Sequence, residues 1–293
     1  MQIILFVIIR ILSNPLSNLF QKKLVAQKDN PLFIIFVTFL FLSIAAIPLY
    51  PKLFDAGLPV EYFIYMLLCA VFAVSSNAFL VKALSCSDLS LLGPINSYKP
   101  LVGMFFGIFM LSEIPSLIGL LGVGLILSGS YFVVENNSSS KLRGRIKIFF
   151  LDKGIQYRFA ALFLSGVEAV FLKKALTYST PLISMVVWCA AGFFVSLMLL
   201  PFIKRKNDLS LLKSIMNNKK LYLLLFITTA AMQYTTLLVF ENMQVSYALA
   251  LFQTSAIVSV FLGYKFFREK NIVNRLIGSI LMICGSILII LYK

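Results

Sequence analysis

The chain repeats itself internally, and its second half falls on its first half at an offset of 156 residues. No gap is needed from Asn77, which falls on Gln233, to Ser130, which falls on Ser286. The matched pairs between these ends include Ser90 with Ser246, Gly107 with Gly263, Glu113 with Glu269, Gly122 with Gly278 and Gly129 with Gly285. Duplication of a helical membrane unit is typical of secondary transporters, since two similar halves can rock about a site at their junction. The repeat therefore favours solute transport.

Composition makes lipid the main solvent of this chain. Hydrophobic residues make up 60% of it, charged residues 13%, and its mean hydropathy is +0.95. A helix needs about 20 apolar residues to cross a bilayer. Ten such windows are present, at 2–20, 32–50, 60–81, 91–111, 115–134, 157–176, 182–203, 221–240, 247–267 and 273–292. We therefore predict an all-α membrane protein with ten transmembrane helices.

The distribution of charge points to a membrane surface and away from nucleic acid. The net charge is +15, but most of the 26 Lys and Arg residues lie on connections that follow odd-numbered helices. The largest groups are Lys141, Arg143, Arg145 and Lys147, and Lys204, Arg205, Lys206, Lys213, Lys219 and Lys220. Such loops usually face the cytoplasm and anionic headgroups. The rule predicts a multi-pass protein of the cell (inner) membrane with both termini outside the cytoplasm.

No cofactor or metal is expected. The four cysteines, Cys69, Cys86, Cys189 and Cys284, are far apart and lie in or beside apolar stretches. Their spacing indicates neither a disulfide framework nor a metal site. The chain also carries no ATP-binding loop, so an ion or solute gradient is the expected energy source.

The windows divide the chain into two repeats of five helices, 1–135 and 157–293, joined by a polar, basic linker at 136–156. An odd number of helices in each repeat makes the two halves enter the membrane in opposite directions. We therefore predict an inverted repeat.

One segment carries a resemblance to a known family. Leu111-Ser112-Glu113 precedes a glycine-spaced helix at 118–129, and Arg268-Glu269 precedes another at 276–285. With Pro94 upstream, these residues resemble the drug/metabolite transporter superfamily, in its ten-helix EamA-type branch. Ser112 and Arg268 stand where the family pattern has glycine.

The resemblance implies a transporter fold over nearly the whole chain. Members export amino acids, drugs or other metabolites, move lipid-linked sugars, or exchange sugar phosphates, and they often keep their termini in the cytoplasm. That last expectation is opposite to the one from charge. The implied partners are a small-molecule substrate and the bilayer, with the protein a monomer or a homodimer.

Three ionisable residues lie near the centres of predicted helices. Arg10, Lys99 and Glu168 would each cost about 2.5–3.5 kcal/mol in lipid unless they face a cavity or a partner. Arg10 and Asn14 share one face of the first helix, because they lie one turn apart. These residues are candidate binding residues.

Polar side chains of the fourth and ninth helices extend this set. Asn96, Tyr98 and Lys99 precede Pro100, which frees a backbone carbonyl and can kink the helix. Gln253 lies in the equivalent stretch of the ninth helix. The full predicted substrate site is Arg10, Asn14, Asn77, Asn96, Tyr98, Lys99, Glu168, Trp188, Gln233 and Gln253.

For several of these residues a purely structural role remains an alternative interpretation. Arg10 could snorkel to the nearer surface. Lys99 and Glu168 could form a buried structural pair, and Asn77 and Gln233 could only join helices. Tyr98 and Trp188 could line a cavity for an apolar or aromatic solute.

Other features favour a structural role. Glu113 and Glu269 lie in turns, where a carboxylate near a helix N-terminus is stabilised by the dipole. Gly122 and Gly129 are seven residues apart, as are Gly278 and Gly285, so each pair lies on one helix face and allows close packing.

The sequence thus predicts a secondary transporter that exports an amino acid or organic anion, with Glu168 as the ionisable coupling residue. A lipid-linked sugar flippase on the same fold is the alternative. An intramembrane enzyme is disfavoured because the chain has no histidine, the commonest general base.

Overall fold

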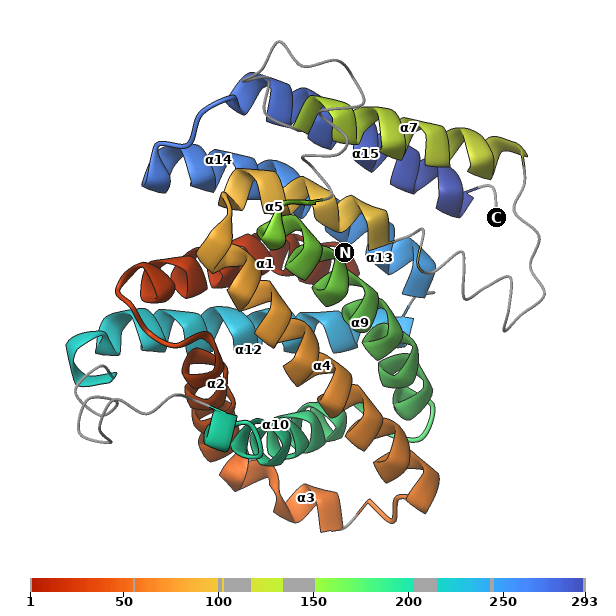
Figure 1. The fold of residues 1–293 in the computed structure, drawn as a ribbon. Helices are drawn as coiled ribbons and strands as arrows, with labels where there is room; N and C mark the ends of the chain where they lie inside the picture. The colour runs from red at the N-terminus through yellow and green to blue at the C-terminus, as the bar shows by residue number, and fades with distance from the viewer. Residues whose placement is uncertain are drawn as a thin grey trace.

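The computed structural model describes residues 2–54, 56–99, 102, 117–133, 151–202, 215–242 and 245–291. Within these ranges every regular element is a helix (Figure 1). The first half contains α1 (Gln2–Ala26), α2 (Pro31–Ala46), η1 (Ile47–Leu49), α3 (Pro51–Phe54), α4 (Val60–Cys86), α5 (Leu89–Ile95), η2 (Asn96–Tyr98) and α7 (Leu117–Val133). The second contains α9 (Lys153–Leu176), α10 (Pro181–Leu197), η3 (Leu200–Phe202), α12 (Lys219–Asn242), α13 (Val245–Gln253), α14 (Ser255–Phe267) and α15 (Ile272–Leu291).

Similar local sequences begin corresponding helices in the two halves. At α2 the Asn30 side chain accepts from the Leu32 amide at 2.9 Å, and Pro31 takes the first helical position. At α10 Thr180 and Pro181 take the same roles, with Thr180 accepting from the Ile183 amide. A capping side chain followed by proline suits a helix start, since proline has no amide to leave unpaired there.

Four described helices are long and apolar enough to cross a membrane. They are Gln2–Ala26, Pro31–Leu49, Val60–Cys86 and Lys219–Asn242. Shorter apolar helical stretches lie at Pro181–Leu197, at Leu251–Phe267, which includes the turn at Thr254, and at Ile272–Leu288. Large apolar side chains point outward, as with Ile4 at 65% and Leu117 at 81% exposure. Such an exterior fits lipid as solvent. The count of ten spanning helices stays a prediction.

The helices pack in pairs that join the two halves of the chain. Within the described residues, α1 lies along α12 and α4 along α9, and α7 packs against α15, α5 against α14 and α2 against α10 (Figure 1). Ser17 of α1 and Thr229 of α12 share a buried hydroxyl hydrogen bond of 3.0 Å. Each half therefore supplies packing surface to the other.

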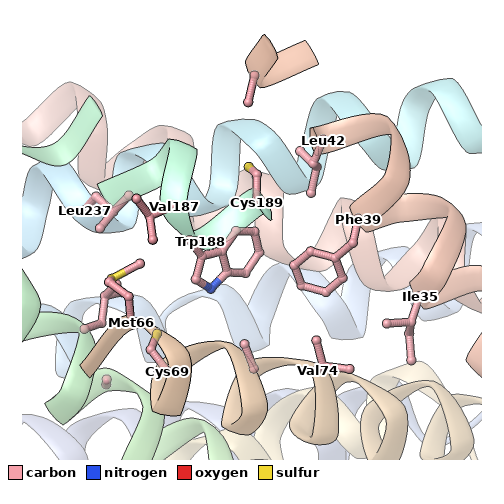
Figure 2. Close-up of a cluster of buried hydrophobic side chains, with 14 of the residues drawn as sticks. Ile35, Phe39, Leu42, Met66, Cys69, Val74, Val187, Trp188, Cys189 and Leu237 are labelled. Atoms are coloured by element: carbon pink, nitrogen blue, oxygen red, sulfur yellow. The ribbon is translucent and has the colours of Figure 1, made fainter. Parts of the chain in front are cut away.

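A central apolar core lies between α2, α4, α10 and α12. Ile35, Phe39 and Leu42 of α2 face Met66, Cys69 and Val74 of α4 and Val187, Trp188 and Cys189 of α10, with Leu237 of α12 nearby (Figure 2). The Phe39 and Trp188 rings have their centroids 4.8 Å apart. This packing fixes the α10 residues that reach the polar site described below.

The structure differs from the predicted windows in two places. The single window at 247–267 is two helices, because the chain turns at Thr254 between α13 and α14. The window at 91–111 is regular α-helix only to Ile95 and then tightens into η2, while most of its remainder, Pro100 included, lies outside the described residues. By the repeat offset, Tyr98 and Thr254 are equivalent, so both irregular turns fall at matching positions.

The predicted linker at 136–156 lies mostly outside the described residues. The described chain resumes at Leu151, and α9 begins at Lys153, inside the predicted linker. The repeat boundaries therefore stay predictions.

Candidate functional site

Three side chains from distant parts of the chain meet electrostatically inside the helix bundle. Glu168 of α9 interacts most strongly with Lys99, which follows η2, and also with Arg10 of α1. All three are half-buried. Charges interact strongly where little water surrounds them. We call Arg10, Lys99 and Glu168 the charged centre, and it carries two cations for one carboxylate.

Arg10 turns into the bundle. Its Nε donates to Thr236 Oγ1 of α12 at 2.6 Å, and its guanidinium lies 4.7 Å from the centroid of the Phe252 ring of α13. These contacts disfavour the expectation that Arg10 snorkels to the surface. Its Nη1 is buried and has no hydrogen-bond partner. One donor arm of the guanidinium is therefore available to a ligand.

Trp188 closes the charged centre on the α10 side. The ring is 2% exposed, and its nitrogen is turned toward Met66 and Cys69 (Figure 2). The indole N–H interacts with the Glu168 carboxylate. Because the Trp188 ring packs against Phe39, it is the indole nitrogen and not the ring face that Trp188 turns toward the charged centre.

The predicted amide residues have different partners. Asn96 donates to Gln253 Oε1 at 3.1 Å, and this bond joins the two irregular turns of the halves. Asn14 donates to Ser255 Oγ at 3.4 Å, at the start of α14. Three polar residues predicted from separate helices thus line the same junction.

Asn77 and Gln233 behave differently from each other. Asn77 Nδ2 donates to the Ala73 carbonyl of its own helix at 3.0 Å, so its amide N–H bond does not join two helices. Gln233 is 5% exposed, lies one turn from Thr236, and has an unpartnered Nε2. Gln233 is therefore a second donor without a partner, close to the contact between Arg10 and Thr236.

Tyr98 is 9% exposed and packs edge-on against Phe159, with ring centroids 5.2 Å apart. Tyr98 therefore belongs to the buried hydrophobic cluster that includes residues of α5 and α9. The arrangement gives it a packing role at the edge of the charged centre.

Arg158 is a nearby cation that the sequence did not indicate. It is 6% exposed on α9, and its Nε donates to the Leu92 carbonyl of α5 at 3.0 Å. It also interacts repulsively with Lys99. Because Arg158 is the second residue of the predicted window 157–176, it resembled a charge of the preceding linker. Its position just inside the window was the only feature of the sequence that indicated burial.

A second polar cluster ties the two halves together at the start of α5. Glu269, in the turn after α14, accepts from the Leu89 amide at 2.9 Å and the Ser90 amide at 2.8 Å, and also from the Ser90 hydroxyl. Lys22 Nζ donates to Glu269 at 2.8 Å. Arg275 donates to the Ser90 hydroxyl and pairs with Asp88 at 2.9 Å. We call Lys22, Asp88, Ser90, Glu269 and Arg275 the cap network.

The cap network explains the role of the turn glutamate. Glu269 was expected to benefit from a helix dipole, and it does so at α5 of the other half. Burial raises the pKa of the Glu269 carboxyl, but hydrogen bonds from Lys22 and Ser90 outweigh burial, so its pKa lies below the usual value. Its counterpart, Glu113, lies outside the described residues.

The fold and the charged centre define a class: a helical membrane protein with an ionisable polar site between two packed halves. The chain belongs to the EamA-like transporter family, whose model matches residues 1–135 and 152–291. It is thus a membrane transporter of the drug/metabolite transporter type, as the sequence resemblance predicted.

Comparison with solved structures supports the fold alone. A chain titled only "Crystal structure of protein" aligns with a TM-score of 0.60 at 13% identity, over 96% of this chain and 95% of that one. No curated protein matches this sequence.

Proposed function

We propose that the protein is a secondary active transporter that exports a small metabolite, such as an amino acid or an organic anion, by alternating access driven by an ion or solute gradient. The observation that carries the proposal is the charged centre, where two cations meet one carboxylate. Charged groups are expensive inside a membrane and are kept there mainly for function.

The unpartnered atoms favour an anionic or zwitterionic substrate. Arg10 Nη1 and Gln233 Nε2 are both N–H donors, and both are buried. A buried donor costs about 1–3 kcal/mol when it is unsatisfied. A carboxylate supplies several acceptor positions, while the α-amino group of an amino acid would find Glu168. The further proposed binding residues are Asn14, Asn77, Asn96, Tyr98, Lys99 and Gln253.

Glu168 is the proposed coupling residue because it faces both cations. In its ionised form it neutralises part of their charge and competes with an anionic substrate. In its protonated form it leaves Lys99 and Arg10 to the substrate. Binding of a proton and of the substrate anion would then favour each other, which is what coupling between two ligands requires.

Alternating access is supported by how the halves pack. Cross-half pairs such as α1 with α12 and α4 with α9, and the irregular turns after Ile95 and at Thr254, are the kind of parts that transporter repeats use to move around a central site. We propose five-helix repeats at 1–135 and 157–293, related by inversion, in the cell (inner) membrane.

The test is untargeted metabolite analysis of the medium from cells that overexpress the wild-type chain or Glu168→Gln. Glu241→Gln, which changes an exposed carboxylate on α12, serves as the matched control. We expect a compound enriched outside only with the wild type and the control, at equal membrane abundance of all three proteins. Equal enrichment with Glu168→Gln would refute the coupling role. No enrichment with any of them, together with altered lipid extracts, would refute metabolite export in favour of lipid movement.

A further inference from the structure

A groove lies on the outside of the bundle, between α2 and the first two turns of α12. Its volume is about 590 Å³, within the range of about 300–1,000 Å³ usual for ligand sites. Its lining residues are Phe41, Ile44, Ala45, Ile215, Lys219, Lys220, Tyr222, Leu223 and Phe226. Ile44, Ala45 and Leu223 are exposed, so the groove faces the surroundings of the protein. We call it the lysine groove.

The groove combines an apolar wall with one cationic end. Lys219 and Lys220 are exposed in the first turn of α12, and Leu223 and Phe226 follow on the next turns. The first turn of this 24-residue helix also carries the positive end of its dipole. The lining of the groove is therefore apolar, the stems of Lys219 and Lys220 included, and the positive charge of these exposed lysines lies beside the lining, where α12 begins.

One carboxylate, that of Asp29, contacts residues at the start of α12. Asp29 Oδ2 accepts from the Tyr222 hydroxyl at 2.9 Å and from the Asn218 amide at 3.4 Å. It is not part of the groove lining. The stretch 203–214, which lies outside the described residues, contains Lys204, Arg205, Lys206 and Lys213 and one acid, Asp208.

We propose that the lysine groove binds one anionic phospholipid. Lys219 and Lys220 hold the phosphate at the membrane boundary, where the spanning helix α12 begins. An acyl chain lies along Leu223 and Phe226 against Phe41 and Ala45 of α2. A water-soluble anion would gain nothing from these apolar side chains, whereas a lipid uses both parts. The site is separate from the charged centre and does not depend on the transported substrate.

The test is native mass spectrometry of the full chain, released from micelles that contain phosphatidylglycerol or phosphatidylcholine. The wild type is expected to retain phosphatidylglycerol preferentially. Lys219→Gln/Lys220→Gln should lower that occupancy roughly thirtyfold, since two lysines that attract the anionic lipid are removed together. Lys265→Gln/Lys270→Gln removes two exposed lysines elsewhere and should leave occupancy unchanged.

A second variant separates the groove from plain charge attraction. Ala45 is exposed, so Ala45→Trp fills the groove without entering the core and leaves both lysines in place. We expect it to lose the bound phosphatidylglycerol as well. Retention at the wild-type level in Ala45→Trp would overturn the proposal. So would equal retention of the two lipids by the wild type, or equal loss in both lysine double variants.

Discussion

Arg10 is held in the charged centre by a hydrogen bond to Thr236 and by the ring of Phe252. Removing the hydrogen bond should therefore affect substrate binding. Thr236 Oγ1 accepts from Arg10 Nε at 2.6 Å while itself donating to the Met232 carbonyl. Thr236→Val keeps the shape of the side chain and removes the acceptor. A hydrogen bond to a charged group contributes about 1.5–3 kcal/mol, so we expect the apparent KM for the exported compound to rise about tenfold or more.

Thr235→Val is the matched control for that measurement. Thr235 is also buried, but its hydroxyl donates only to the Ala231 and Met232 carbonyls of its own helix. Export kinetics at equal membrane abundance should remain close to wild type. If both variants changed KM alike, the Arg10 contact would have no special role in binding.

Glu269 gives the cap network a pH-dependent contribution to stability. Its pKa is lower in the folded protein than in the unfolded chain, so the contribution is fully present above the unfolded value of about 4.3. It is lost as the pH falls through the folded pKa. Glu269→Gln should lower the apparent Tm in detergent by several degrees at pH 7, because the half-buried Lys22 loses its charged partner.

The difference in Tm between wild type and Glu269→Gln should shrink as the pH falls below about 4.3. Thermal unfolding followed by tryptophan fluorescence at several pH values measures it. Glu241→Gln, at an exposed carboxylate, provides the reference for general acid effects. A difference that stayed constant down to pH 3 would contradict the assigned role of the carboxylate.

For single residues, the sequence was informative where placing the side chain in lipid would cost free energy. Arg10, Lys99 and Glu168 could be selected because a charge in an apolar window needs a reason. Arg158 was not selected, since its window edge looked like an ordinary loop charge. The partners within the cap network could not be derived either, because Lys22 and Glu269 are 247 residues apart and only the fold brings them together.

Among the elements, α7 and α15 show how glycine sets a helix spacing. A Cβ on Gly285 would lie 2.5 Å from the Gly122 carbonyl oxygen and 2.9 Å from the Ile126 side chain. The glycine-lined contact predicted from the seven-residue spacing is thus confirmed. Gly285→Ala forces the two helices apart and should cost about 1–3 kcal/mol.

The fraction of folded protein after heating, measured by size-exclusion chromatography in detergent, reports this cost. Gly124→Ala is the control on α7, because a Cβ there meets nothing within 4 Å. Its stability should be unchanged or slightly higher, since alanine is the better helix former. A Gly285→Ala protein as stable as Gly124→Ala would show that the helices can separate at no cost.

The length of the apolar windows predicted that helices form in these stretches, but it did not predict where the helices are interrupted. The turn at Thr254 has neither proline nor glycine beside it, and only the polar run Gln253-Thr254-Ser255 marks it within the apolar window. It is accompanied instead by tertiary contacts, with Gln253 bonded to Asn96 and Ser255 to Asn14. Contacts of this kind override local propensity and are invisible in a single sequence.

For the whole molecule, the cross-half pairs predict that neither half is stable without the other. Expressed alone, a first half of residues 1–135 would expose the α1 and α4 faces that pack on α12 and α9. A half of residues 152–293 would lose the partners of α12 and of Trp188, whose ring packs on Phe39 of α2. We expect each half alone to be degraded in the membrane, because packing between helices is the main force that holds such bundles together.

Co-expression of the two halves should rescue both. An affinity tag on the first half should then co-purify the second in a 1:1 ratio, and export should recover at least in part, since no described helix crosses from one half to the other. Gly285→Ala in the second half should reduce the co-purified amount, while Gly124→Ala in the first should not. Accumulation of either half alone as a stable, monodisperse protein would contradict this prediction. Each half would then have a complete core of its own, and the site between the halves would not depend on their packing.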